Sequence, residues 1–148
     1  MEYKEIKGNI LTAPADYMIA QFLAADFVPK SILSFKLNDI YGVRNKLLLD
    51  YPNTKVNYWD KLYPDYRGFC LQTGRIFNLI VKRTYDDVET SITIKNAFEW
   101  LKEKCEYSHI KKVAISKQSF KNIDWNEVMA IIYEVFWEND IEIVVYEK

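Results

Sequence analysis

The sequence predicts an α/β fold in which a mixed β-sheet lies between layers of α-helices. Short apolar runs of strand length alternate along the chain with segments whose apolar residues recur at helical spacing. One pair of strands is separated by a short glycine-containing turn, which indicates a hairpin within an otherwise parallel arrangement. The length of 148 residues fits one domain, so we expect residues 1–148 to form a single unit.

The first part of the chain contains two predicted strands and one predicted helix. Tyr3–Lys7 alternates charged and apolar residues, as a half-buried strand does, and Tyr17–Leu23 is a continuous apolar run typical of a buried parallel strand. Pro29 then marks a helix start, where its missing N–H is tolerated. The apolar face expected for this helix consists of Ile32, Leu33, Phe35, Leu37, Ile40, Val43, Leu47 and Leu48.

The hairpin and a long helix follow. Phe69–Leu71 and Arg75–Lys82 flank the turn Gln72–Gly74. Thr90–Tyr107 keeps an apolar side at helical spacing, formed by Ile94, Ala97, Phe98, Leu101 and Cys105. We therefore expect this helix to pack on the sheet that the hairpin joins.

The last part of the chain is predicted to form a strand, a helix and a second strand. Val113–Ile115 is a short apolar strand, and Asp124 is a good N-cap, with Glu127 placed to complete a capping box. The helix that follows directs Val128, Ile131, Ile132, Val135 and Phe136 inward. Ile141–Tyr146 is the closing strand, which completes the predicted alternation of strands and helices.

Composition limits the classes of partner. The net charge is −1 with mixed signs along the chain, which favours neither nucleic acid nor an anionic membrane as a partner. Without a signal-peptide pattern at the start or a run long enough to span a bilayer, the sequence predicts a cytoplasmic protein. Cys70 and Cys105 have no metal-ligand spacing, so we expect two free thiols and neither a metal nor a cofactor.

Ligands of open α/β sheets bind beyond the carboxyl ends of the strands. The loops expected there are Gly8–Leu11, Ala24–Ser31 and Ser116–Ile123. These three loops are therefore expected to contain the residues that form a site.

Three stretches, Lys7–Thr12, Ala20–Phe27 and Trp125–Tyr146, together resemble macrodomains in their order and spacing. Lys7–Thr12 is similar to the family's KGDI/L strand end, Ala20–Phe27 to its AHCISADF segment, and Trp125–Tyr146 to its W-x-x-V ending. The resemblance covers nearly the whole chain and is strongest to the small single-domain branch, which includes glycohydrolases that remove ADP-ribose from modified proteins. It implies a macrodomain-like mixed sheet between helices, and an ADP-ribose-like nucleotide as the ligand to test.

The resemblance also shows where this chain departs from the family pattern. Macrodomains grip a diphosphate with two glycine-rich loops, because side chains would keep backbone N–H groups away from the anion. Here Lys30 and Ile32 stand at the positions of two of those glycines, and Ser116–Ile123 contains no glycine. Lys121 stands where the family's catalytic aspartate would be, and an ammonium has the wrong sign for that role. Asp124 is better explained as an N-cap.

The family's site positions correspond to eight candidate ligand-binding residues: Asn9, Ile10, Gln21, Asp26, Lys30, Ser31, Ser119 and Phe120. Lys82 aligns with a lysine that one branch of hydrolases uses as a nucleophile, and it is the one weak catalytic candidate. A Lys-Arg pair such as Lys82-Arg83 at a strand end is commonly solvated, and we expect Lys30 and the lone His109 to be solvated as well.

Two functions follow. Because the departures affect one expected crevice, the first is a pseudoenzyme: a macrodomain-fold binding or interaction module without hydrolase activity, whose recognition of ADP-ribose is weak, altered or lost. The alternative is an ADP-ribosyl glycohydrolase or ADP-ribose reader that works with rearranged loops. A protein partner or a homodimer formed through Trp59, Tyr63, Tyr66 and Trp137 is compatible with the first function. Whether Phe120 and Ile32 fill the crevice decides how much room a ligand has.

Overall fold

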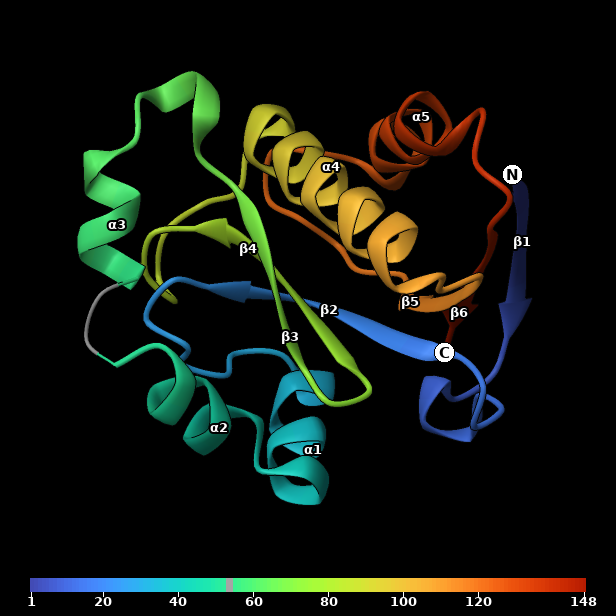
Figure 1. Cartoon of the computed structure of the whole chain (residues 1–148), viewed down its shortest axis with the longest axis horizontal. Helices are drawn as coiled ribbons and strands as arrows, with labels where there is room; N and C mark the ends of the chain where they lie inside the picture. The colour runs from blue at the N-terminus through green and yellow to red at the C-terminus, as the bar shows by residue number, and fades with distance from the viewer. Residues whose placement is uncertain (53–54) are drawn as a thin grey trace.

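The computed structural model describes residues 1–52 and 55–148. Its centre is a six-stranded sheet with the order β1-β6-β5-β2-β4-β3 (Figure 1). Neighbouring strands are parallel except β3 and β4, which form the predicted antiparallel hairpin. The strands are β1 (Glu2–Lys7), β2 (Met18–Ala24), β3 (Phe69–Thr73), β4 (Ile76–Lys82), β5 (Lys112–Ser116) and β6 (Glu142–Glu147).

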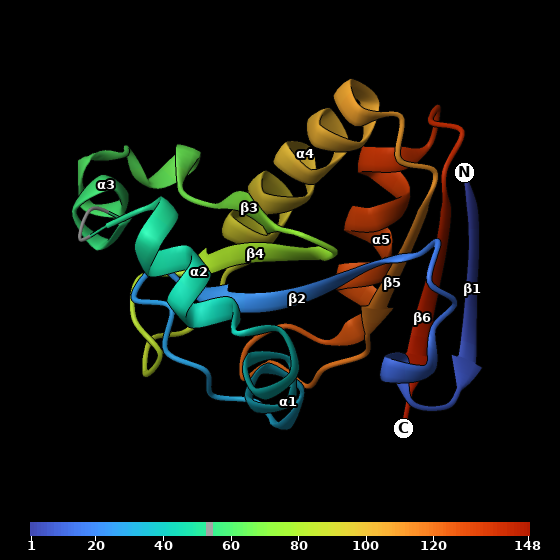
Figure 2. The ribbon, with the colours of Figure 1, turned by 60° about the horizontal axis from the view of Figure 1, so that its bottom comes forward.

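Helices cover both faces of the sheet. One face carries α4 (Ser91–Ser108) and α5 (Trp125–Phe136), and the other carries α1 (Ile32–Tyr41) and α2 (Val43–Asp50) (Figure 2). Helix α3 (Lys55–Lys61) lies near the β3 edge, where Trp59 contacts Phe69, and the 3-10 helix η2 (Pro64–Tyr66) leads into β3. A second 3-10 helix, η1 (Ile10–Thr12), follows β1. The predicted α/β sandwich with a mixed sheet is confirmed.

The alternation of side chains along β4 explains its continuous apolar sequence. Phe77 and Leu79 join the core beneath α4 and α5, whereas Ile76 and Ile80 join the core beneath α1 and α2. Every residue of β4 is buried, as expected for a strand covered on both faces.

The signals for the hairpin turn and for the start of α5 were correct. Gly74 takes a positive φ of 56° in the hairpin turn. Asp124 caps α5 by accepting a hydrogen bond from the Glu127 N–H at 3.0 Å. The capping box expected at Asp124 and Glu127 has only this one bond, whereas a reciprocal capping box is formed at α4, where Thr90 and Thr93 exchange both bonds.

The predicted helix over Pro29–Leu48 was wrong in its extent. It begins at Ile32, with Ser31 as its N-cap, and Gly42 interrupts it in the left-handed conformation (φ 61°) that ends α1 and starts α2. The predicted apolar face is also only partly buried, because Ile32 is 71% exposed and Phe35 and Ile40 are exposed as well. Leu37, Val43 and Leu47 carry the contact with the sheet.

Two further expectations need correction. Strand β1 is not half-buried: it is an edge strand in which Tyr3 alone is partly covered. Trp59 is not an exposed interface residue, since it is the buried residue of α3 and is 5% exposed, whereas Tyr63, Tyr66 and Trp137 are exposed.

The cysteines are free, and both are buried. Burial raises the pKa of the Cys105 thiol to about 12 and that of Cys70 further, so neither thiol is a reactive nucleophile. In the described part of the chain, no helix is both long and apolar enough to cross a membrane.

Candidate functional site

A groove runs along the carboxyl ends of the parallel strands. It consists of two adjoining cavities, of about 400 Å³ and about 340 Å³, which share Ser31, Gln118 and Ser119 in their walls. The loops Gly8–Leu11, Ala24–Ser31 and Ser116–Ile123 all contribute to this groove. The three loops expected from the rule for open α/β sheets therefore line one groove.

The smaller cavity, here the apolar cavity, is walled mainly by η1 and the start of α1. Ile10, Leu11, Ile32 and Leu33 supply its apolar surface, and Tyr146 closes the side next to β6. Asn9 also lines it, and its Oδ1 accepts a hydrogen bond from the Leu11 N–H at 3.0 Å, which caps η1. An apolar wall with polar groups at its edge suits a flat ring such as a nucleobase.

The larger cavity, here the charged cavity, contains an ion pair. Lys82 at the end of β4 places its Nζ 3.0 Å from Oε1 of Glu89, and both side chains are 11% exposed. Lys30, Lys121, Asp86 and Asp87 complete its charged lining. The expectation that Lys82 is solvated was wrong, because the loop between β4 and α4 folds back and brings Glu89 onto it.

Arg83 points elsewhere. It forms a bidentate ion pair with Asp60 of α3, with distances of 2.8 and 3.1 Å. This pair holds the pKa of Asp60 below its usual value. Arg83 is therefore engaged with α3 and does not line the charged cavity.

The shared wall of the groove is held by a chain of buried hydrogen bonds. The Ser31 hydroxyl donates to Ser34 Oγ at 2.9 Å, and Ser34 donates to Gln21 Oε1 at 2.7 Å. Gln21 in turn donates to Asn78 Oδ1 at 2.8 Å. Gln21 is 2% exposed and lines neither cavity, so it supports Ser31 from behind and does not contact the groove.

Asp26 also lies outside both cavities. Its carboxylate accepts hydrogen bonds from the Val28 N–H at 3.1 Å and the Tyr85 N–H at 2.9 Å. These bonds join the loop after β2 to the loop after β4. Lys30 is exposed at the rim of the charged cavity, consistent with the solvated residue that we expected.

The loop after β5 leaves the groove open. Phe120 packs edge-to-face on Phe22, with ring centroids 5.1 Å apart, and so lies against the core. Ile32 is exposed at the first position of α1, so neither residue fills the crevice. Ser119 and Lys121 are exposed in this loop and border the charged cavity.

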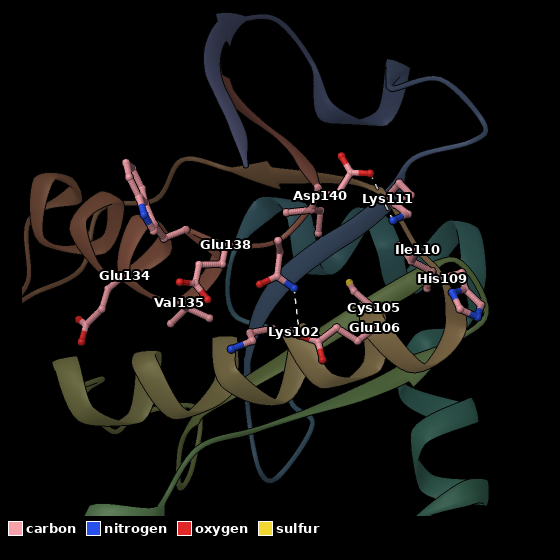
Figure 3. Close-up of a pocket in the computed structure, with 13 residues that line it drawn as sticks. Lys102, Cys105, Glu106, His109, Ile110, Lys111, Glu134, Val135, Glu138 and Asp140 are labelled. Atoms are coloured by element: carbon pink, nitrogen blue, oxygen red, sulfur yellow. Dashed lines mark hydrogen bonds and ion pairs between the residues drawn. The ribbon is translucent and has the colours of Figure 1, made fainter.

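Another concavity, of about 630 Å³, lies at the opposite ends of β5 and β6, between the C-terminal ends of α4 and α5 (Figure 3). Its rim includes the exposed pair Lys111–Asp140, with Nζ and Oδ2 3.4 Å apart, and His109, which is exposed as expected and ends α4. Because it lies at the amino ends of the parallel strands, we favour the groove as the ligand site.

Comparisons with solved structures identify the architecture. The macrodomain of Thermus aquaticus DarG matches with a TM-score of 0.72 and 18% identity, covering 99% of this chain and 98% of that one. The macrodomain of Mycobacterium tuberculosis DarG matches with a TM-score of 0.74 and 16% identity, covering 97% and 96%. The chain has the macrodomain fold. Thermosipho africanus DarTG in complex with ADP-ribose matches with a TM-score of 0.66 and 12% identity, covering 99% of this chain and 42% of that chain.

At these identities the likeness establishes the macrodomain fold alone. No family model and no curated protein sequence matches this chain. What the groove can do must therefore be argued from its own residues.

Within this macrodomain fold, the groove has side chains where the family pattern has glycines. Lys30 and Ile32 lie at its rim, and none of the four glycines lies in Ala24–Ser31 or Ser116–Ile123. In the described ranges 1–52 and 55–148, no cluster of His, Cys, Asp and Glu side chains could hold a metal ion. The groove therefore offers ammonium groups, hydroxyls, amides and three carboxylates, of which that of Glu89 is largely buried.

Glu89, Asp86 and Gln118 line the groove but were not predicted from the sequence as site residues. Glu89 directly precedes the Thr90 cap of α4, in a loop that also begins at the carboxyl end of a parallel strand. Including Arg83–Thr90 among the loops after strands would have found both acidic residues.

Proposed function

We propose that this chain is a macrodomain-fold binding module. It binds an ADP-ribose-type ligand through contacts that differ from the family pattern, and it does not hydrolyse that ligand. The observation that carries the proposal is the open, continuous groove at the carboxyl ends of the strands. The two adjoining cavities, one apolar and one charged, suit a ligand with a flat ring at one end and a polar group at the other. An open groove favours altered recognition over lost recognition.

The ligand class is supported by the fold and by one similar protein. Thermosipho africanus DarTG, which matches this chain over its length, was solved in complex with ADP-ribose. In this chain the apolar cavity would hold the base, and the shared wall at Ser31, Gln118 and Ser119 would lie beside the diphosphate. Side-chain hydroxyls and amides would then replace the backbone N–H groups of glycine loops.

The groove's charges argue against hydrolysis. Lys121 offers an ammonium where an oxocarbenium-like centre would need a carboxylate. The amine of Lys82 is engaged with Glu89 at 3.0 Å, so it is not free to act as a nucleophile.

Thermal-shift titration with ADP-ribose tests the proposal. A ligand at about 100 times its dissociation constant stabilises by about 2.7 kcal/mol. We expect a saturable shift that Ser119→Trp abolishes by filling the groove. Ser108→Trp, at the far end of α4, is the matched control and should leave the shift unchanged. A wild-type protein without a saturable shift would contradict binding.

The alternative, an ADP-ribosyl glycohydrolase with rearranged loops, is favoured by one observation. A lysine amine and a carboxylate, those of Lys82 and Glu89, lie together in the wall of the charged cavity. Incubation with an ADP-ribosylated protein separates the two functions. Release of ADP-ribose that disappears in Lys82→Ala would establish the enzyme, whereas the binding module releases none.

A further inference from the structure

The two cavities of the groove differ in their charge. Three lysines (Lys30, Lys82 and Lys121) and three carboxylates (Asp86, Asp87 and Glu89) line the charged cavity, so its lining is balanced. Three lysines (Lys36, Lys117 and Lys148) line the apolar cavity, and no Asp or Glu side chain lies in its wall, although Lys117 pairs with Glu5 at 3.4 Å and Glu147 at 3.8 Å outside it. An anionic group therefore gains more from the apolar cavity and the shared wall than from the charged cavity.

Within the charged cavity, Glu89 differs from the other two acids. Asp86 and Asp87 are exposed, and the Thr84 hydroxyl, followed by Lys30 and Lys82, lowers the pKa of Asp86. Glu89 is largely buried, and its charge acts on the cavity with little solvent screening. A negative group brought beside Lys82 would meet Glu89 at short range.

We propose, on the basis of the function above, that Glu89 is a specificity-determining residue. It makes the charged cavity accept a neutral, hydroxyl-bearing end of the ligand, such as a sugar, and exclude a terminal phosphate. A sugar hydroxyl can accept from Lys82 Nζ while a neighbouring hydroxyl donates to the Glu89 carboxylate, so both charges stay paired. A phosphate competes with Glu89 for Lys82 and places like charges next to each other.

ADP-ribose and ATP form a suitable pair of probes, because both carry ADP and they differ in a terminal ribose or a terminal phosphate. Their dissociation constants are measured by isothermal titration calorimetry without divalent cations. We expect wild-type protein to bind ADP-ribose at least about tenfold more tightly than ATP, since juxtaposed like charges are strongly unfavourable.

Glu89→Gln keeps the size of the side chain and removes its charge. The ratio of the two affinities should fall by about tenfold or more in this variant, mainly because ATP binding improves. Lys82→Met should weaken both ligands, because it leaves the Glu89 charge without its partner. Glu138→Gln, an exposed acid at the opposite end of the sheet, is the matched control and should leave the ratio as in wild type.

Each result bears on a different part of the inference. If ADP-ribose binds but Glu89→Gln leaves the ratio unchanged, the role of Glu89 is overturned and the binding function stands. If wild type binds ATP as tightly as ADP-ribose, the inference fails even without a folded variant. If neither probe binds, the proposed function and the inference both fail.

Discussion

Ser34 and Gln21 are joined by a buried hydrogen bond of 2.7 Å between Ser34 Oγ and Gln21 Oε1. The bond ties the first turn of α1 to the middle of β2, and it continues through Asn78 to the Thr73 hydroxyl of β3. Ser31, which lines both cavities, rests on this chain through Ser34. The position of the groove wall is therefore set by polar groups within the core.

Gln21→Met should destabilise the protein, because it leaves Asn78 Oδ1 without its donor and the Ser34 hydroxyl without its acceptor. The expected loss in free energy of unfolding is about 2–3 kcal/mol, as for unsatisfied buried polar groups. Urea denaturation at neutral pH measures it. Gln72→Met is the matched control: Gln72 donates to the Gly74 carbonyl at the surface, and a change within about 0.5 kcal/mol is expected. Equal losses of stability in the two variants would contradict the stabilising role of the buried hydrogen bonds of Gln21.

Gly68 lies where η2 meets α4, and a Cβ at this position would collide with the backbone carbonyl of Thr93. Its φ of 119° is also unfavourable for other residues. Gly68→Ala should cost about 2–3 kcal/mol of stability, because backbone on both sides must shift. Gly74→Ala, in open space with a φ of 56°, should cost only about 1 kcal/mol. Thermal unfolding of the two variants compares them, and similar melting temperatures would contradict the close approach.

The sequence predicted the elements that have strong local signals. Buried runs located β2, β5 and β6, apolar spacing located α4, and the Asp124 cap located the start of α5. The interruption at Gly42 was missed because apolar spacing continues through it, although a glycine in the left-handed conformation is a common helix end. Helix α3 has one buried residue, Trp59, so its sequence carries little periodic signal.

The site was predictable in its loops and not in its contacts. The pairing of Lys82 with Glu89 depends on how the loop Arg83–Thr90 folds, which no local pattern specifies. Gln21 was expected to contact a ligand. Its side chain instead points toward Asn78, its partner in the neighbouring strand β4, and donates a hydrogen bond to it. Polar residues in buried strands can serve the core or the ligand, and only the tertiary structure separates these roles.

Asp124→Ala tests whether this aspartate is structural or catalytic. The carboxylate accepts from the Glu127 N–H at 3.0 Å, and losing an N-cap costs about 1 kcal/mol. Asp124→Asn retains an acceptor, so its free energy of unfolding should fall by only a few tenths of a kcal/mol. Affinity for ADP-ribose should be unchanged in both, as measured by calorimetry. A loss of affinity in the stable Asn variant would instead assign Asp124 to the site.

Glu142 should make stability depend on pH at the acidic end. A hydrogen bond from Tyr17, followed by one from Lys4, lowers the pKa of this carboxyl below its usual 4.5, and the Tyr17 bond raises the pKa of that phenol to about 12. A carboxyl whose pKa is lowered on folding stabilises the protein above its unfolded value, and this contribution is lost as the pH falls through the folded value. Near pH 7 the free energy of unfolding of wild type should exceed that of Glu142→Gln by up to about 1 kcal/mol. This difference should vanish at pH values below the pKa of Glu142 in the folded protein. Urea denaturation across that range measures it, with the exposed Glu138→Gln as control. A difference between wild type and Glu142→Gln that stays constant with pH would mean that packing, and not charge, is the contribution of Glu142.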